Sequence, residues 1–269
     1  MKCAALAMAL SVWAGAAAAG CADQAGACEI SGGTYHIALP EAAQRPVPVV
    51  MFLHGYGGSG AGTLKNTRMI NAFKARGYAV IAPNATRRRN GNRSWVFFPG
   101  WEGRDEATFF RDVMADAGDR FGVSKQDTVL AGFSAGGFMV NYLACAHPDD
   151  FAAYASISGG FWRPQPESCS APVRLFHTHG WADKTVPLEG RYLGGIQYQQ
   201  GDIYAGLELW RQTNHCDSNA PGKAWQDDKV LRRRWDCGAG ADIEFILYPG
   251  GHTVPKGWAD LMLDWFEKE

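Results

Sequence analysis

The sequence has no excess of charge of either sign. Its 26 lysine and arginine residues face 27 aspartate and glutamate residues, which gives a formal net charge of −1. Binding along nucleic-acid phosphates requires a basic surface, so this balance argues against a nucleic-acid partner. Two basic runs, at 87–89 and 232–234, are expected to be solvated loop charges. The alternative is that they assist with an anionic group of a substrate.

Beyond its N-terminal region the chain also lacks a hydrophobic run long enough to cross a bilayer. That region contains Lys2, an alanine-rich apolar run and an Ala-x-Ala pattern, which together are typical of a secretory signal peptide. We therefore expect a signal peptide at 1–20 and a single domain at 21–269, in a secreted or periplasmic protein with no transmembrane segment. The mature sequence has no internal repeat and no low-complexity tract.

The cysteines lack the close CxxC spacing that is typical of structural metal sites, so we predict no metal site. Six cysteines follow the signal, and an even number in an exported protein suggests disulfide bonds. Fifteen pairings are possible, and the order in the chain suggests Cys21–Cys28, Cys145–Cys169 and Cys216–Cys237. A minor alternative is a lipid on Cys21, because Ala-Ala-Gly-Cys weakly resembles a lipoprotein signal.

Apolar segments rich in β-branched residues alternate with segments of helical periodicity. Runs typical of buried strands occupy 47–54, 78–83, 127–132, 152–158, 173–178 and 242–248. Helical patterns occupy 62–77, 105–122, 134–147 and 255–267. Continuous apolar strands separated by helices predict an α/β fold, with a mostly parallel central sheet and helices on both faces. Ligand sites in such sheets form outside the carboxyl ends of the strands.

Ser134 lies in a G-x-S-x-G pattern, between Gly132 and Gly136, directly after the predicted strand 127–132. A strand that turns sharply into a helix needs small neighbours at the bend, and a serine there projects its hydroxyl into the cleft. The pattern alone is weak evidence, because it also occurs by chance in glycine-rich turns. Its meaning depends on the residues at the ends of the other strands.

Asp183 and His252 each come after a different predicted strand, in the order Ser–Asp–His that α/β-hydrolases use. His252 can remove the proton that keeps the Ser134 hydroxyl a poor nucleophile. Asp183 can hold the imidazole in one tautomer and stabilise its charged form. The backbone amides of Tyr56 and Ala135 are the candidate donors to a developing oxyanion. This combination predicts a two-step acyl transfer that requires no cofactor.

Three other histidines lie near these strand ends. His54 begins the glycine-rich segment HGYGG, and we expect its side chain to support that loop through hydrogen bonds. His177 is expected to be a core residue or to contact residues of the site without contacting substrate. His179 is expected to orient the loop that carries Asp183.

Four segments together resemble the polyhydroxybutyrate depolymerase-like esterases, which are secreted α/β-hydrolases related to feruloyl and acetyl xylan esterases: LHGYGGSG, AGFSAGG, HTHGWADKTVP and YPGGHTVP. The resemblance covers about residues 28–268. It places the nucleophile, acid, base and two oxyanion amides at Ser134, Asp183, His252, Tyr56 and Ala135. Cys216 and Cys237 resemble a family disulfide before the last strand. Many relatives have asparagine where this chain has Ala135, which weakens the inference about substrate.

The predicted substrate is a carboxylic ester, and the predicted class includes esters of polymers. The resemblance favours a hydroxyalkanoate polyester or oligomer, and the alternative is a feruloyl or acetyl ester of a plant polysaccharide. A serine peptidase and a non-catalytic binding protein are further alternatives. The segment between the strands 152–158 and 173–178 is too short for a large helical lid. Aromatic side chains in nearby loops are candidates for stacking on a substrate ring: Trp95, Trp101, Trp162 and Trp181.

Overall fold

The computed structural model describes residues 20–22, 24–42 and 44–268, so the predicted signal peptide lies, apart from Gly20, outside the described residues. The strands of the main sheet are β1 (Gly20–Cys21), β2 (Gln24–Ala25), β3 (Cys28–Ile30), β4 (Gly33–Ala38), β5 (Val47–Leu53), β6 (Ala79–Pro83), β9 (Val123–Phe133), β10 (Ala153–Ile157), β12 (Leu175–Gly180), β15 (Lys223–Asp227), β16 (Val230–Asp236) and β17 (Asp242–Tyr248). Two smaller sheets contain β7 (Thr86–Arg87) with β8 (Arg93–Ser94), and β11 (Trp162–Arg163) with β13 (Tyr192–Leu193) and β14 (Tyr198–Gln200).

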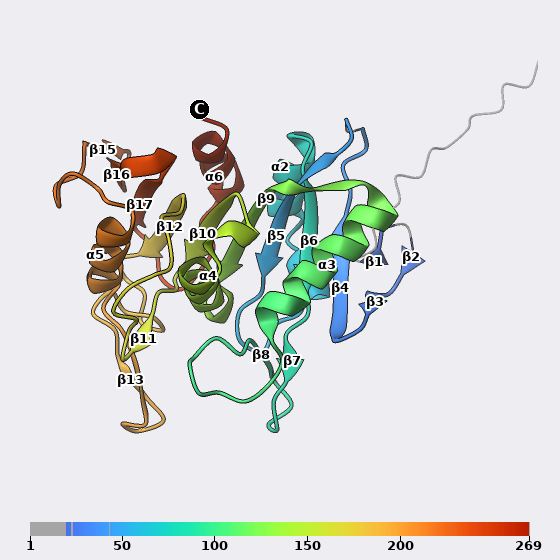
Figure 1. Ribbon diagram of the computed structural model, residues 1–269, viewed down its shortest axis with the longest axis horizontal. Helices are drawn as coiled ribbons and strands as arrows, with labels where there is room; N and C mark the ends of the chain where they lie inside the picture. The colour runs from blue at the N-terminus through green and yellow to red at the C-terminus, as the bar shows by residue number, and fades with distance from the viewer. Residues whose placement is uncertain (1–19, 23, 43, 269) are drawn as a thin grey trace, which may run out of the picture.

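The main sheet has twelve strands, in the order β15-β16-β17-β12-β10-β9-β5-β6-β4-β1-β2, with β3 paired to β4 (Figure 1). From β17 to β6 every neighbouring pair is parallel. Antiparallel strands extend the sheet at both edges, namely β16 and β15 at one and β4 at the other. The prediction of a mostly parallel sheet is therefore confirmed, and all six predicted strands are present. The edge strands were not predicted.

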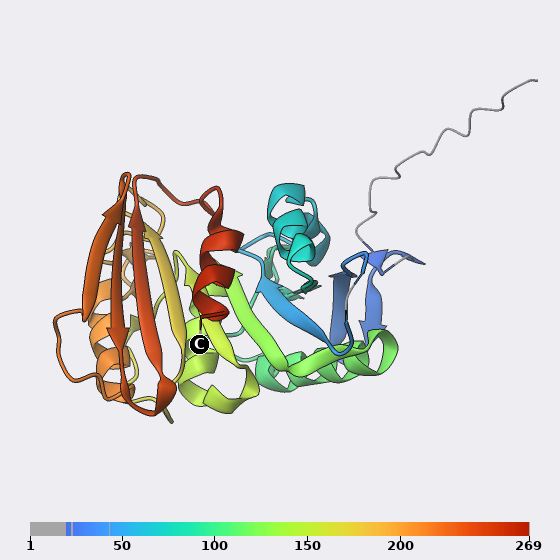
Figure 2. The same ribbon diagram turned by 90° about the horizontal axis from the view of Figure 1, so that it is seen from above.

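Helices cover both faces of this sheet, as the alternating sequence pattern predicts. The helices are α1 (Gly60–Leu64), α2 (Thr67–Ala75), α3 (Glu106–Phe121), α4 (Ala135–Ala146), α5 (Ile203–Thr213) and α6 (Trp258–Phe266), with short 3-10 turns at Pro148–Asp150 and Gly238–Gly240. Figure 2 shows α2 and α6 on one face and α3, α4 and α5 on the other. Each layer has its own core, and the larger core lies under α3, α4 and α5.

The predicted single helix over 62–77 is two helices, because the chain contains two capping residues. Ser59 caps α1 by accepting a hydrogen bond from the Gly62 amide. Asn66 then caps α2 by accepting one from the Met69 amide. A side chain that satisfies free amides at a helix start favours a new helix there. The break therefore results from Asn66, which the apolar periodicity does not reveal.

The prediction that Arg232, Arg233 and Arg234 are solvated loop charges is wrong. They lie in β16, and Arg232 is buried, with its Nε 2.8 Å from Oε1 of Glu244 on the neighbouring strand. Burial of a guanidinium is unfavourable unless a carboxylate pairs with it, and Glu244 provides that partner. The apolar-strand criterion misses β16 because three consecutive arginines interrupt its apolar pattern, although it pairs with β15 on one side and β17 on the other.

The three disulfides suggested by chain order are present: Cys21–Cys28, Cys145–Cys169 and Cys216–Cys237. The Cys21 sulfur is therefore bonded to that of Cys28, which contradicts the alternative of a lipid on Cys21. Among the described residues, no helix is long and apolar enough to cross a membrane. Between β10 and β12 the described chain forms only the two-residue strand β11, so a large helical lid is absent there, as predicted.

Candidate active site

Ser134 occupies the turn that joins β9 to α4, and its backbone is strained. Its φ is 56° and its ψ is −117°. Residues other than glycine rarely adopt this backbone conformation, which costs on the order of 1–3 kcal/mol. The Ser134 amide donates to the Ile157 carbonyl of β10 at 2.9 Å, and the Ser134 carbonyl accepts from the Phe138 amide at 2.9 Å. The sheet and the helix therefore hold the strained residue from both sides.

Gly132 and Gly136 permit this turn because backbone passes directly over both of them. A Cβ on Gly132 would overlap the Gly136 carbonyl, and a Cβ on Gly136 would overlap the Leu53 carbonyl of β5. The first turn of α4 thus packs against the ends of β9 and β5 with no room for side chains. The mechanical role predicted for these two glycines is consistent with this packing.

The structure brings Ser134, His252 and Asp183 into one hydrogen-bonded chain. The Ser134 hydroxyl lies 2.9 Å from His252 Nε2, and His252 Nδ1 lies 2.7 Å from Asp183 Oδ2. With the proton on Nδ1, the imidazole donates to the carboxylate and accepts from the serine. This is the arrangement in which a histidine can take the serine proton.

The other oxygen of Asp183 is held by the backbone of its own loop. The amides of Thr185 and Val186 both donate to Asp183 Oδ1 at 2.9 Å. Burial by itself raises the pKa of the Asp183 carboxyl, but the Val186 amide and His252 outweigh it and lower that pKa below its usual value. The carboxyl group is therefore ionised at neutral pH.

His177 and His179 support the loop of Asp183 from inside the sheet. His177 Nε2 lies 3.2 Å from His179 Nδ1, and His179 Nε2 lies 2.8 Å from the Val186 carbonyl. Both rings are buried, and burial lowers the pKa of each imidazole. His179 therefore fixes the residue whose amide holds Asp183, which agrees with the orienting role expected from the sequence.

The loop after β17 carries His252 and is fixed by two sets of hydrogen bonds. The Tyr248 hydroxyl donates within the loop, with the Gly251 carbonyl at 2.8 Å. The Ala182 amide donates to the Gly250 carbonyl at 3.0 Å, which ties this loop to the loop of Asp183. The Phe133 ring also packs on the His252 ring, with centroids 4.7 Å apart.

The loop after β5 lies against Ser134. A Cβ on Gly55 would be 3.3 Å from the Ser134 Cβ. His54 supports this loop as predicted, since its Nδ1 lies 2.7 Å from the Gly55 carbonyl and its Nε2 accepts from the Ala85 amide at 3.2 Å. Burial lowers the pKa of His54 to about 4, so this imidazole is neutral at physiological pH.

Tyr56 and Ala135, the two predicted oxyanion positions, line the same cavity as Ser134. Ala135 is the first residue of α4, so its amide has no acceptor within the helix. It also lies at the positive end of the helix dipole, where negative charge is stabilised. Tyr56 comes from the loop after β5, which places its amide on a different element from that of Ala135.

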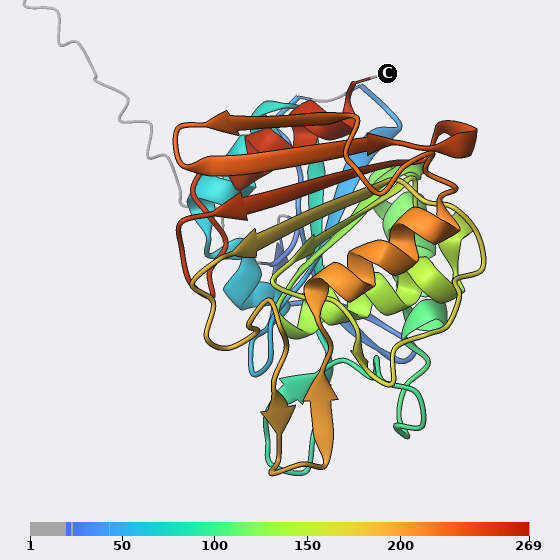
Figure 3. The ribbon, with the colours of Figure 1, turned by 90° about the vertical axis from the view of Figure 1, so that its left-hand side faces the viewer.

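A cavity of about 940 Å³ opens beside Ser134. It lies at the carboxyl end of the parallel strands, between the segment of β7 and β8 and the segment of β13 and β14, which both project from that end of the molecule (Figures 1 and 3). Five large aromatic side chains gather on its wall, beside polar and charged ones: Phe97, Trp101, Phe138, Trp162 and Tyr198. Such a wall fits a flat apolar group of a substrate better than a small polar one.

The four tryptophans predicted to contact substrate have different positions. Trp101 and Trp162 line the cavity. Trp95 is fully buried and donates from its indole to the His54 carbonyl at 2.8 Å, so it supports the loop and offers no surface for stacking. Trp181 is 46% exposed and lies outside the cavity lining.

Sequence reasoning missed several residues of the cavity wall. Phe138 comes four residues after Ser134 on a predicted helix, so helical spacing places it beside the serine. Tyr198 and Gln200 come from 181–202, a segment to which no pattern assigned an element. Arg88, from the basic run 87–89, also lines the cavity, and its guanidinium lies 4.9 Å from the centre of the Trp101 ring.

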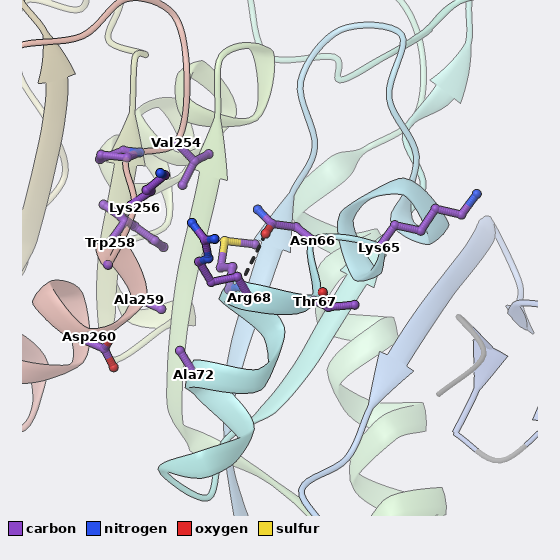
Figure 4. Close-up of a pocket in the computed structure, with 13 residues that line it drawn as sticks. Lys65, Asn66, Thr67, Arg68, Ala72, Val254, Lys256, Trp258, Ala259 and Asp260 are labelled. Atoms are coloured by element: carbon purple, nitrogen blue, oxygen red, sulfur yellow. Dashed lines mark hydrogen bonds between the residues drawn. The ribbon is translucent and has the colours of Figure 1, made fainter. Parts of the chain in front are cut away.

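A second cavity, of about 410 Å³, lies between the N-terminal ends of α2 and α6 (Figure 4). Lys65, Arg68 and Lys256 contribute basic side chains to its wall. Ser134 and His252 do not line it, so it is separate from the hydrogen-bonded chain described above.

Comparison with known proteins identifies one family and related esterases. The model of a family described as phospholipase/carboxylesterase matches residues 35–195, more than half of the chain. Feruloyl esterase C of Emericella nidulans is 25% identical over 258 residues, which are 90% of this chain and 86% of the relative. A bifunctional acetylxylan esterase/xylanase of Neocallimastix patriciarum is 24% identical over 87% of this chain and 33% of that protein.

The fold has solved counterparts. An acetyl xylan esterase from Aspergillus awamori aligns with a TM-score of 0.68, at 17% sequence identity, over 88% of this chain and 94% of that chain. A carboxylesterase from Bacillus cereus aligns with a TM-score of 0.57 at 14% identity, over 88% of this chain and 94% of that chain. At such identities the likeness concerns the fold alone, and it confirms the predicted α/β-hydrolase architecture.

The substitution Gly136→Ala should be strongly destabilising, because the new methyl group overlaps the Leu53 carbonyl. We expect a loss of unfolding free energy of about 2 kcal/mol or more in urea denaturation. Gly206→Ala, in α5, is the matched control, since its new methyl group meets Phe161 at an ordinary 3.6 Å. That control should be neutral or stabilising by up to about 1 kcal/mol. Equal effects of the two substitutions would contradict the packing argument.

Stability should fall in mild acid because His54, His177 and His179 have lowered pKa values when folded. Below about pH 6.5 the unfolded chain binds protons that the folded chain does not, so the contribution is fully present above that pH. His54 alone should remove about 1.5 kcal/mol between pH 6.5 and pH 5. Urea unfolding at both pH values measures the loss, and His54→Gln should reduce it. Stability that is equal or higher at pH 5 would refute this assignment.

Proposed function

Since the chain belongs to the phospholipase/carboxylesterase family and is a carboxylic ester hydrolase, we propose that it acts through an acyl-enzyme on Ser134. The supporting observation is the hydrogen-bonded chain from the Ser134 hydroxyl through His252 to Asp183. A serine hydroxyl at the start of a helix, with an imidazole at 2.9 Å, has both a base and an electrostatically favourable position.

In the first step His252 Nε2 takes the proton as Ser134 Oγ attacks the ester carbonyl. The imidazolium that forms is stabilised by the Asp183 carboxylate at its Nδ1. The carbonyl oxygen becomes an oxyanion, which the amides of Tyr56 and Ala135 stabilise. His252 then donates its proton to the departing alcohol, and the acyl group remains on the serine.

The second step repeats this chemistry with water. The vacated leaving-group side admits a water molecule, from which His252 removes a proton as the oxygen attacks the acyl carbonyl. The same two amides stabilise the second oxyanion. Collapse releases the carboxylic acid and returns the proton to Ser134. Each step uses only groups of the chain, the ester and water.

We propose an aromatic acyl ester of a plant polysaccharide, of the feruloyl type, as the substrate. The aromatic wall of the cavity beside Ser134 supports this proposal, because a flat acyl group buries its apolar faces there. Relatives named feruloyl esterase C cover about nine tenths of the chain, which supports it as well. The polyester hypothesis that the sequence motifs favoured has less support, because these relatives favour its alternative.

Acetylated xylan is the second candidate, favoured by the relative from Neocallimastix patriciarum. An acetyl group would fill only a small part of a cavity of about 940 Å³, so the cavity favours the larger acyl group. We also propose that the protein acts outside the cytoplasm. Its three disulfides support this location, since disulfides persist in oxidising compartments.

Replacing the proposed nucleophile tests the mechanism. Ser134→Ala should lower kcat for p-nitrophenyl butyrate at least about ten-thousand-fold, because the acyl-enzyme cannot form. The circular dichroism spectrum should be unchanged. Ser168→Ala, at an exposed serine outside the cavity, is the matched control and should retain full activity. Retention of a tenth or more of the activity by Ser134→Ala would exclude Ser134 as the nucleophile.

A substrate panel tests the acyl preference. We expect kcat/KM for methyl ferulate to exceed that for methyl acetate at least about tenfold, because the cavity buries an aromatic ring. The panel also contains acetylated xylan and short hydroxybutyrate oligomers. Higher activity on acetylated xylan would favour the second candidate. Higher activity on the oligomers would restore the polyester hypothesis.

A further inference from the structure

Trp162 and Gln200 lie opposite each other in the small sheet that forms one wall of the cavity beside Ser134. They are register partners on the antiparallel strands β11 and β14, so their side chains share one face of that sheet. Both side chains line the cavity, and they are only 8% and 4% exposed. Phe138, one helical turn after Ser134, packs on the Trp162 ring with centroids 5.9 Å apart.

Trp162 and Gln200 each have a polar side-chain atom that pairs with nothing in the described part of the chain. Trp162 Nε1 and Gln200 Oε1 are shielded from solvent and form no hydrogen bond with any described residue. The other five buried tryptophans all donate from the indole nitrogen: Trp95 to His54, Trp210 to Asn141, Trp235 to Asn219, Trp258 to Thr178 and Trp265 to Asp242. Buried polar groups are normally paired, so Trp162 is an exception that requires a reason.

The Trp162 ring is fixed by its neighbours and cannot turn to find a partner within the protein. Its centroid lies 5.1 Å from that of Phe97, 5.4 Å from that of Trp101 and 5.5 Å from that of Tyr198. The Gln200 amide has more freedom, because rotation about the last side-chain bond of glutamine is broad. It can therefore turn its oxygen toward a group that enters the cavity.

We propose that Trp162 and Gln200 together bind a hydroxyl group on the acyl part of the ester, which makes phenolic acyl esters the preferred substrates. A hydroxyl can accept from the indole N–H and donate to the amide oxygen, so it pairs both atoms at once. A methoxyl group in the same place can only accept. This inference rests on the proposed function to the extent that the acyl group occupies this cavity.

The test compares kcat/KM for methyl 4-hydroxycinnamate and methyl 4-methoxycinnamate, with methyl cinnamate as the parent ester. The wild-type enzyme should prefer the hydroxylated ester over the methoxylated one at least about tenfold, because a site built to hydrogen-bond a hydroxyl rejects analogues that lack it. The two substituents donate electrons similarly, so carbonyl reactivity does not produce the preference. The ratio is also independent of the fraction of folded enzyme.

Gln200→Leu should reduce this ratio to within about twofold of one, because it removes the acceptor that only a hydroxyl can use. Trp162→Phe removes a donor that hydroxyl and methoxyl groups can both use, so it should instead lower the preference for the hydroxylated ester over methyl cinnamate. Gln199→Leu is the matched control: this neighbour points to the opposite face of the same strand and should retain the wild-type ratio. If Gln200→Leu folds poorly, Trp162→Phe tests the other contact of the same hydroxyl, through the ratio to methyl cinnamate, while it retains an aromatic ring.

A wild-type ratio near one, or a ratio that survives Gln200→Leu, overturns this inference. If the cinnamate esters are hydrolysed in that case, the proposed function stands without it. A wild-type enzyme that hydrolyses p-nitrophenyl butyrate but none of the three cinnamates overturns the aromatic acyl preference and this inference together.

Discussion

The strained turn at Ser134 is the constraint on which the rest of the site depends. Its φ is positive, and the conformation persists because the sheet holds the Ser134 amide and the helix holds its carbonyl. The turn also requires backbone to pass directly over Gly132 and Gly136. Strain at one residue is thus balanced by the packing of three elements, β5, β9 and α4.

The parallel sheet brings distant parts of the chain to this hydroxyl. His252 lies 118 residues after Ser134 in sequence, and Asp183 precedes His252 by 69. They meet because β9, β12 and β17 end at the same edge of one sheet. Hydrogen bonds between the loops, such as that from the Ala182 amide to the Gly250 carbonyl, then fix the spacing. The buried, neutral imidazoles of His177 and His179 support the loop that carries Asp183. The charged group that His252 contacts is therefore the Asp183 carboxylate.

The cavity beside Ser134 has a different origin from the hydrogen-bonded chain. Its aromatic wall comes largely from segments outside the main sheet, including β11, β14 and the loop around β7 and β8. The sheet therefore determines where the proposed chemistry takes place, whereas the irregular segments determine which acyl group fits. The unpaired polar atoms of Trp162 and Gln200 lie in this second part, where a substrate can supply the missing partner.

The sequence by itself predicted the parallel strands, suggested the disulfide pairing, and placed Ser134, Asp183 and His252 after separate strands. These depend on local signals, namely buried apolar runs, cysteine order, and polar residues directly after strands. Only the tertiary structure decided which side chains are buried and which line the cavity, because these positions depend on partners far away in the sequence. Arg232 is buried only because Glu244 lies on the neighbouring strand, and Trp95 is excluded from the cavity because its indole is bonded to the His54 carbonyl. Gln200 reaches the cavity only because β14 pairs with β11, a contact that no local pattern encodes.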